Sequence, residues 1–103
     1  MRLMVTMVNP LHKVEDGIKT FLKMAETKKP QYTKSLGLYA CHGDVGYKLY
    51  NIVEIDDDHI SEGLRELYRN LMLYDNIEGF KVKVELLYSM RTGVELLKEA
   101  GRI

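Results

Sequence analysis

The hydrophobic pattern of this chain changes its period several times, and this alternation limits the possible folds more than any other feature. Residues 2–8 form a short apolar run that ends at Asn9-Pro10, and apolar residues then recur at intervals of three and four. From residue 34 the interval falls to two. The longer period is typical of an amphipathic helix and the shorter one of a half-buried strand. With 103 residues, the chain has room for a single mixed domain over residues 1–103.

The first helix is expected over residues 11–28, after a strand at residues 2–8. Its apolar positions form one helical face: Leu11, Val14, Ile18, Phe21, Leu22 and Ala25. Asn9 is a good N-cap residue, and Pro10 is tolerated at the first helical position because its missing N–H would have no partner there. We therefore predict that Asn9 caps this helix.

A β-hairpin is expected next, with strands at residues 34–42 and 47–55. Apolar side chains alternate with other side chains along both segments. The loop between them contains Gly43 and Gly46, and a short glycine-containing connection between two alternating runs is typical of a hairpin.

A second helix, a fourth strand and a short C-terminal helix complete the pattern. Three aspartates open and cap a helix at residues 58–73, and residues 79–88 alternate more regularly than any other segment. Thr92-Gly93-Val94-Glu95 matches a capping box, which makes Thr92 the N-cap of the last helix. The order βαββαβ predicts an α+β, ferredoxin-like fold, in which an antiparallel sheet carries two helices on one face.

Strand parity divides this sheet into two faces. The face expected under the helices carries Leu3, Val5, Met7, Leu36, Leu38, Ala40, Leu49, Val53, Phe80, Val82, Val84 and Leu86. The opposite face carries Arg2, Met4, Thr6, Val8, Tyr39, Cys41, Lys48, Tyr50, Ile52, Glu54, Lys81, Lys83, Glu85 and Leu87. Its middle strands are too apolar to stay in water, and such a patch marks an interface or a binding cavity. Two copies could join these faces and enclose a barrel, or residues 90–103 could cover the patch.

The chain resembles the dimeric α+β-barrel superfamily and, within it, small uncharacterised proteins of the DUF3303 kind. The resemblance rests on the strand that begins at residue 2, the Asn9-Pro10 helix entry, the hairpin around His42-Gly43-Asp44 and the run YNIVEIDD at residues 50–57. It implies a homodimer with a pocket between sheet and helices or inside the barrel. The superfamily includes cofactor-independent monooxygenases, lactone isomerases, haem-degrading enzymes and non-catalytic ligand-binding domains, and a fold does not choose among them.

Two sets of candidate site residues follow. The candidate ligand-binding residues are those expected in the apolar patch: Met4, Tyr39, Cys41, Tyr50 and Ile52. His42 is the candidate catalytic residue because Asp44 lies nearby, and a histidine near a carboxylate can act as a general base. The alternative is an ordinary hairpin turn with His42 exposed at its edge. Cys41 and His42 point to opposite faces of a regular strand, and the three aspartates lack EF-hand spacing, so no metal site is predicted.

Composition excludes several classes of function. Lys and Arg number 15, as do Asp and Glu, so a net charge of zero offers no basic footprint for nucleic acid. No uncharged stretch approaches the roughly 20 residues of a membrane span, and Pro10 ends the first apolar run too soon for a signal peptide. We expect a cytoplasmic homodimer, without metal or cofactor, that catalyses no reaction and either binds a small, partly apolar ligand or serves only as an interaction domain. The alternative is a cofactor-independent monooxygenase- or isomerase-like enzyme with His42 as acid/base.

Overall fold

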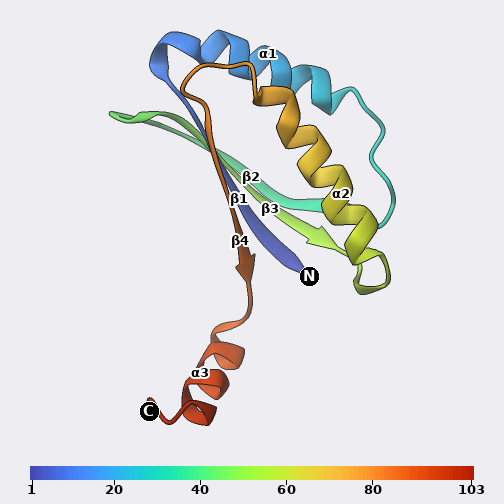
Figure 1. Ribbon diagram of the computed structural model, residues 1–103, viewed down its shortest axis with the longest axis vertical. Coiled ribbons are helices and arrows are strands. Elements are labelled where there is room, and N and C mark those ends of the chain that lie inside the picture. The colour runs from blue at the N-terminus through green and yellow to red at the C-terminus, as the bar shows by residue number, and fades with distance from the viewer.

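The computed structural model describes residues 1–103 and contains one four-stranded antiparallel sheet with three helices (Figure 1). In chain order the elements are β1 (Arg2–Asn9), α1 (Val14–Ala25), β2 (Thr33–Gly43), β3 (Gly46–Ile55), α2 (Ile60–Leu71), β4 (Lys81–Leu87) and α3 (Met90–Glu99). Short 3₁₀ turns lie at Leu11–Lys13, Asp57–His59 and Met72–Tyr74. The strands lie side by side in the order β2-β3-β1-β4. The predicted α+β class is confirmed, and the ends of every predicted strand and helix lie within three residues of the observed ones.

β1 lies at the centre of the core. It pairs with β3 on one side and with β4 on the other. Leu3, Val5 and Met7 are almost fully buried, whereas the side chains between them are only half-buried. Phe21 of α1 and Leu67 of α2 pack against the same buried cluster. Both helices therefore cover one face of the sheet (Figure 1).

The edge strands are less well covered on that face than the central ones. The register places Leu86 of β4 opposite Leu3, as strand parity predicts, but Leu86 is 61% exposed. On the other edge, Leu38 of β2 is 45% exposed. α1 crosses one end of the sheet instead of lying along it (Figure 1). The prediction that the whole helix-facing set is buried is therefore wrong for both edges.

β2 contains a bulge that the alternating pattern does not reveal. The register shifts between Ser35 and Gly37, which leaves Leu36 without a single partner. Beyond the bulge, Tyr39 pairs with Tyr50, so the remaining residues of β2 lie on the predicted faces. A Cβ atom on Gly37 would lie 2.9 Å from the ring of Tyr39, so the absence of a side chain at Gly37 lets this ring approach the backbone.

Asn9 does not cap α1, so that prediction is wrong. Asn9 is the last residue of β1, it pairs with Tyr47 of β3, and its side chain is fully buried. The strand ladder turns this side chain toward the helices, where any Cβ atom on Gly17 would overlap it. The helix begins instead with a 3₁₀ turn after Pro10, and no side chain caps that turn.

The C-terminal helix α3 is present, but it begins earlier than the capping box predicts. The backbone N–H of Thr92 donates a hydrogen bond of 3.1 Å to the Ser89 hydroxyl, which makes Ser89 the N-cap in place of Thr92. A serine at that position satisfies one of the free amides of the first turn. α3 stands clear of the sheet, beyond the end of β4 (Figure 1).

A charge on the core side of β4 is expected to damage the fold far more than a charge on the other side. Val84 packs against the core opposite Val5, so Val84→Asp should lower the free energy of unfolding by roughly 3 kcal/mol, the cost of a buried and unpaired charge. The Lys83 side chain is 68% exposed, so Lys83→Asp should cost less than about 1 kcal/mol. Urea unfolding measures both, and equal losses would contradict the assigned faces of β4.

Tyr74 is expected to make the fold sensitive to alkali. Its ring stacks on Phe80 with the ring centroids 4.5 Å apart, and its buried hydroxyl has no hydrogen-bond partner. Burial raises the pKa of Tyr74 from 10.0 to about 12. An unfolded chain loses this proton from pH 10 upward while the folded chain keeps it. The free energy of unfolding is therefore independent of this group below pH 10 and falls as the pH rises from 10 to about 12.

Tyr74→Phe keeps the stacked ring and removes the hydroxyl. We expect it to raise the free energy of unfolding at pH 8 by about 1 kcal/mol, because a buried unpaired hydroxyl is removed. The loss of stability between pH 10 and pH 12 should also be smaller than in the unmodified protein. Urea unfolding at pH 8 and pH 11 measures both effects, with Tyr88→Phe, at an exposed ring, as the control. The same pH dependence in Tyr74→Phe and the unmodified protein would rule out this role.

Candidate functional site

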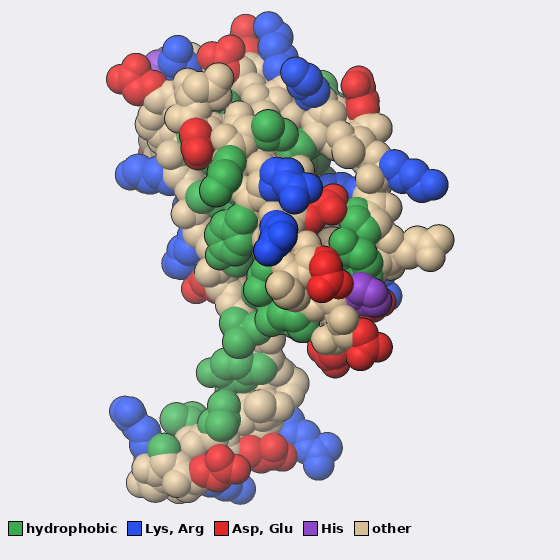
Figure 2. Space-filling model, turned by 45° about the vertical axis from the view of Figure 1, so that its right-hand side comes forward, with side chains coloured by type: hydrophobic (Ala, Val, Ile, Leu, Met, Phe, Trp, Pro, Cys, Tyr) green, Lys and Arg blue, Asp and Glu red, His purple; other side chains and the backbone are tan.

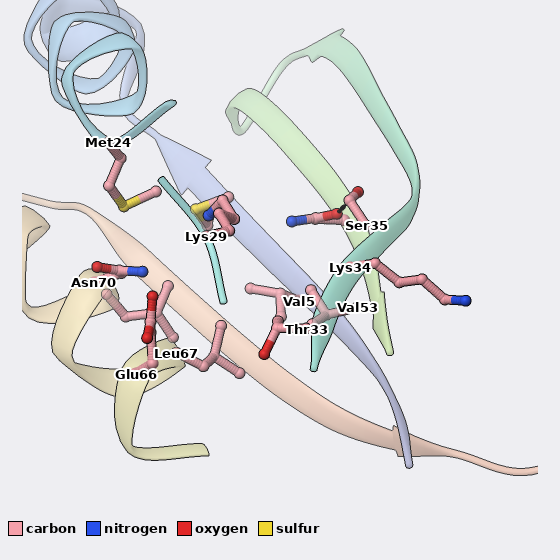
Figure 3. A pocket seen from close by; sticks show the side chains of 13 residues that line it. Val5, Met24, Lys29, Thr33, Lys34, Ser35, Val53, Glu66, Leu67 and Asn70 are labelled. Atoms are coloured by element: carbon pink, nitrogen blue, oxygen red, sulfur yellow. Dashed lines mark hydrogen bonds between the residues drawn. The ribbon is translucent and has the colours of Figure 1, made fainter. Parts of the chain in front are cut away.

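A cavity of about 70 Å³ lies between the sheet and the helices α1 and α2. Apolar side chains from all of these elements line it: Val5, Met7, Met24, Val53, Leu67 and Leu71. The other lining residues are polar or charged: Lys29, Thr33, Lys34, Ser35, Asn51, Glu66 and Asn70. In Figure 3 Met24 points inward from α1, Glu66 and Leu67 from α2, and Val5 and Val53 from the strands. No local sequence pattern predicts this cavity, because its residues are spread over several segments, in which each occupies an ordinary core or surface position.

Several polar groups of the cavity are free to bind a ligand. The Thr33 hydroxyl is buried and has no hydrogen-bond partner. Lys29 and Glu66 form no ion pair with each other or with any other residue. The Ser35 hydroxyl, by contrast, donates a hydrogen bond of 2.5 Å to the side-chain oxygen of Asn51. A buried unpaired hydroxyl costs about 1–3 kcal/mol, so a ligand that bonded to Thr33 would remove this cost.

The volume of the cavity limits what can enter it. An apolar cavity of about 150 Å³ holds one benzene molecule, and this cavity has about half of that volume. Pockets for larger organic ligands measure about 300–1,000 Å³. Only a short aliphatic group therefore fits inside, and the polar part of such a ligand would lie among Lys29, Glu66 and Asn70.

The open face, defined here as the sheet face turned away from α1 and α2, carries the predicted ligand-binding residues. Met4 pairs with Ile52, and Tyr50 pairs with Tyr39, so these side chains form neighbouring rows across the central strands. Cys41 lies in the next row, opposite Lys48 on β3. Tyr39 is 65% exposed. The five predicted residues thus share one surface, but none of them lines the cavity.

Charged side chains frame the patch on the open face. At one end, Arg2 Nε lies 2.8 Å and Lys34 Nζ 3.3 Å from the carboxylate of Glu54. The hydrogen bond from Arg2, followed by that from Lys34, lowers the pKa of Glu54. Along β4, Lys81 and Lys83 lie beside the central rows. An apolar centre with a polar rim is the usual anatomy of a protein–protein interface.

His42 lies at the end of β2, in the hairpin that leads to β3. It pairs with Tyr47, and the two rings meet edge to face with their centroids 6.0 Å apart. The side chains of His42, Cys41 and Asp44 are all exposed, and none of them lines the cavity. The register places Cys41 on the open face and His42 on the other face. The structure brings no group of three His, Cys, Asp or Glu side chains together in a way that could hold a metal ion.

The three consecutive aspartates lie before α2, but their side chains do not cap it. That part of the sequence interpretation is wrong. Asp57 Oδ1 instead lies 3.1 Å from the amino group of Met1, which also donates a hydrogen bond to the carbonyl of Ile55. His59, at the end of the same turn, stacks on Tyr32 with the ring centroids 4.6 Å apart. These residues therefore join the start of β1 to the end of β3.

Comparison with known proteins identifies no relative: neither a family model nor a curated protein matches the chain. None of the helices combines the length and the hydropathy that are needed to cross a membrane.

Thr33→Val is expected to stabilise the ligand-free protein. Valine has nearly the shape of threonine, so the substitution removes the unpaired hydroxyl and keeps the packing of the cavity wall. We expect the free energy of unfolding to rise by about 1 kcal/mol. Thr27→Val, at an exposed position after α1, is the control and should change it by less than about 0.5 kcal/mol. A loss of stability in Thr33→Val, measured by urea unfolding, would mean that the hydroxyl already has a partner.

Proposed function

We propose that this protein is a homodimeric, ferredoxin-like α+β barrel that binds a small, partly apolar molecule and catalyses no reaction. The observation that carries the proposal is the cavity between sheet and helices. Its apolar lining suits a short aliphatic group, and the unpaired Thr33 hydroxyl offers a hydrogen bond beside it. Lys29 and Glu66 add one unpaired charge of each sign.

The size of the cavity sets the expected affinity. An aliphatic group of three or four carbon atoms gains roughly 2–3 kcal/mol when it leaves water. One neutral hydrogen bond adds about 1 kcal/mol, and one bond to a charged group about 1.5–3 kcal/mol. The total corresponds to a Kd between millimolar and micromolar. Such an affinity suits the sensing or carriage of an abundant metabolite.

The homodimer is proposed from the open face. A twofold axis parallel to the strands would bring two open faces together and place β4 of one copy beside β2 of the other. The lysines of β4 would then approach Tyr39 and Tyr50 of the second copy, where a lysine can lie over an aromatic ring. The patch around Ile52 would leave water in the same step.

The alternative, a cofactor-independent monooxygenase- or isomerase-like enzyme with His42 as acid/base, has less support. A general base must lie within hydrogen-bond reach of the proton that it removes. In a single chain the His42 side chain is exposed and lies outside the cavity. Binding without catalysis therefore fits the geometry better.

Native mass spectrometry of the overexpressed protein, sprayed directly from the clarified lysate, tests both parts of the proposal, because a ligand of this affinity would be lost on purification. We expect the mass of two chains together with a bound small molecule, at a protein concentration of about 100 µM, where even a micromolar dimer is mostly formed. Ile52→Lys, on the open face, should give single chains, whereas Leu22→Lys, on an exposed position of α1, should leave the dimer intact. Leu67→Trp, which fills the cavity, should lose the small molecule and keep the dimer.

Two results would count against the proposal. An unmodified protein that is a monomer at this concentration would remove the barrel. A small molecule that stays bound in Leu67→Trp would remove the cavity as the binding site. Circular dichroism of each variant shows whether the fold is retained.

A further inference from the structure

We propose that α3 is an exchange arm, which packs on β2 of a second copy of this chain and not on its own domain. The inference rests on the homodimer of the proposed function but not on the ligand. The surface that receives the arm is the exposed helix-facing side of β2, around Leu38 and Ala40.

The first observation is that a single chain exposes too much surface. Its accessible surface is 7517 Å², whereas a compact chain of its mass exposes about 6,000 Å². Its radius of gyration is 15.8 Å, against about 13 Å for a compact chain of this length. The excess of about 1,500 Å² lies within the area that each copy buries in an obligate homodimer, about 1,000–2,500 Å². Contact with a second copy of this chain would therefore bury an area that matches the excess surface.

The second observation is the apolar side of α3. Met90 is 82% exposed, Leu96 47% and Leu97 42%. Figure 2 shows that hydrophobic side chains continue from the main part of the domain, along the segment that joins it to α3, onto this helix. Arg91 and Glu95 form an ion pair of 3.5 Å elsewhere on α3. An amphipathic helix with nothing on its apolar side requires a surface to cover it.

The third observation is the exposed side of β2. Leu38 and Ala40 face the same way as the buried Leu49 of β3, but they are exposed because α1 does not extend over this edge. Leu36 in the bulge is 43% exposed, and Val45 in the hairpin 63%. These residues form an apolar strip along the edge of the sheet. Its length, about 20 Å or more for a strand of this size, exceeds the roughly 15 Å of α3.

The topology favours the second copy over the same chain. β2 and β4 are opposite edges of the sheet, about 14 Å apart across three strand spacings. Only Tyr88 and Ser89 join β4 to α3, and two residues reach no more than about 10 Å. α3 therefore cannot begin beside its own β2. The proposed twofold axis places β4 of one copy next to β2 of the other, so the β2 edge of the second copy lies nearer to the start of α3 than the chain's own β2.

Disulfide trapping on the full chain tests the arm. In a Cys41→Ser background, one chain carries Leu38→Cys and a second chain, distinguished by a mass label, carries Leu97→Cys. Both positions are exposed, so both chains should fold. Mild oxidation of the mixture should give a disulfide-linked pair of two different chains. The matched control replaces Leu38→Cys with Leu22→Cys, at an exposed position of α1, and should give no mixed pair.

The outcomes separate this inference from the proposed function. A mixed disulfide in the first pair and none in the control supports the arm. A dimer without the mixed disulfide overturns the arm and leaves the homodimer in place. A chain that carries both cysteines and closes a disulfide within itself shows that α3 folds back, and this also overturns the arm. An unmodified protein that is a monomer removes both the arm and the homodimer, whatever its ligand.

Discussion

The burial of β1 is the constraint on which the rest of the structure depends. This strand is hydrogen-bonded on both sides. Residues of both helices pack against the buried cluster that contains its side chains Leu3, Val5 and Met7. Only 13 of the 103 residues are buried, so most of the stabilisation from burying apolar surface comes from side chains of β1 and its neighbour β3. The helices cover the two central strands and leave less cover for the edges. The exposed edges and the small cavity are consequences of the same packing.

This thin core connects the fold to the proposed function. A cavity remains where side chains of α1 and α2 meet the sheet without filling the space, and Thr33 places a hydroxyl inside it with no partner. Buried unpaired groups lower stability, and Asn9 and Tyr74 add further ones. A ligand in the cavity and a second chain on the open face would each offset part of this cost, because whatever binds the folded state stabilises it.

The open face and α3 share the property that would make each of them part of an interface. Both leave apolar side chains in water, and both lie where helices α1 and α2 do not reach. The charges around the patch, such as the pairs of Glu54 with Arg2 and Lys34, would orient two copies without contributing much to their affinity. The cavity lies on the other side of the sheet, so the proposed ligand and the proposed second copy would occupy separate surfaces.

The sequence by itself determined which segments are strands and helices and, outside the bulge in β2, which face each strand residue occupies. Val84 and Lys83 show why: a period of two leaves a strand residue only two choices, and the core selects one of them. Local patterns failed where a side chain had more than one possible partner. Asn9 is predicted to cap a helix, but it pairs with β3 as the last residue of β1. Thr92 is predicted to cap α3, but Ser89 is the N-cap residue. The cavity, the exposed edges and the position of α3 were decided by the tertiary structure alone, because they depend on how helices cross a sheet, and no period along the chain encodes that angle.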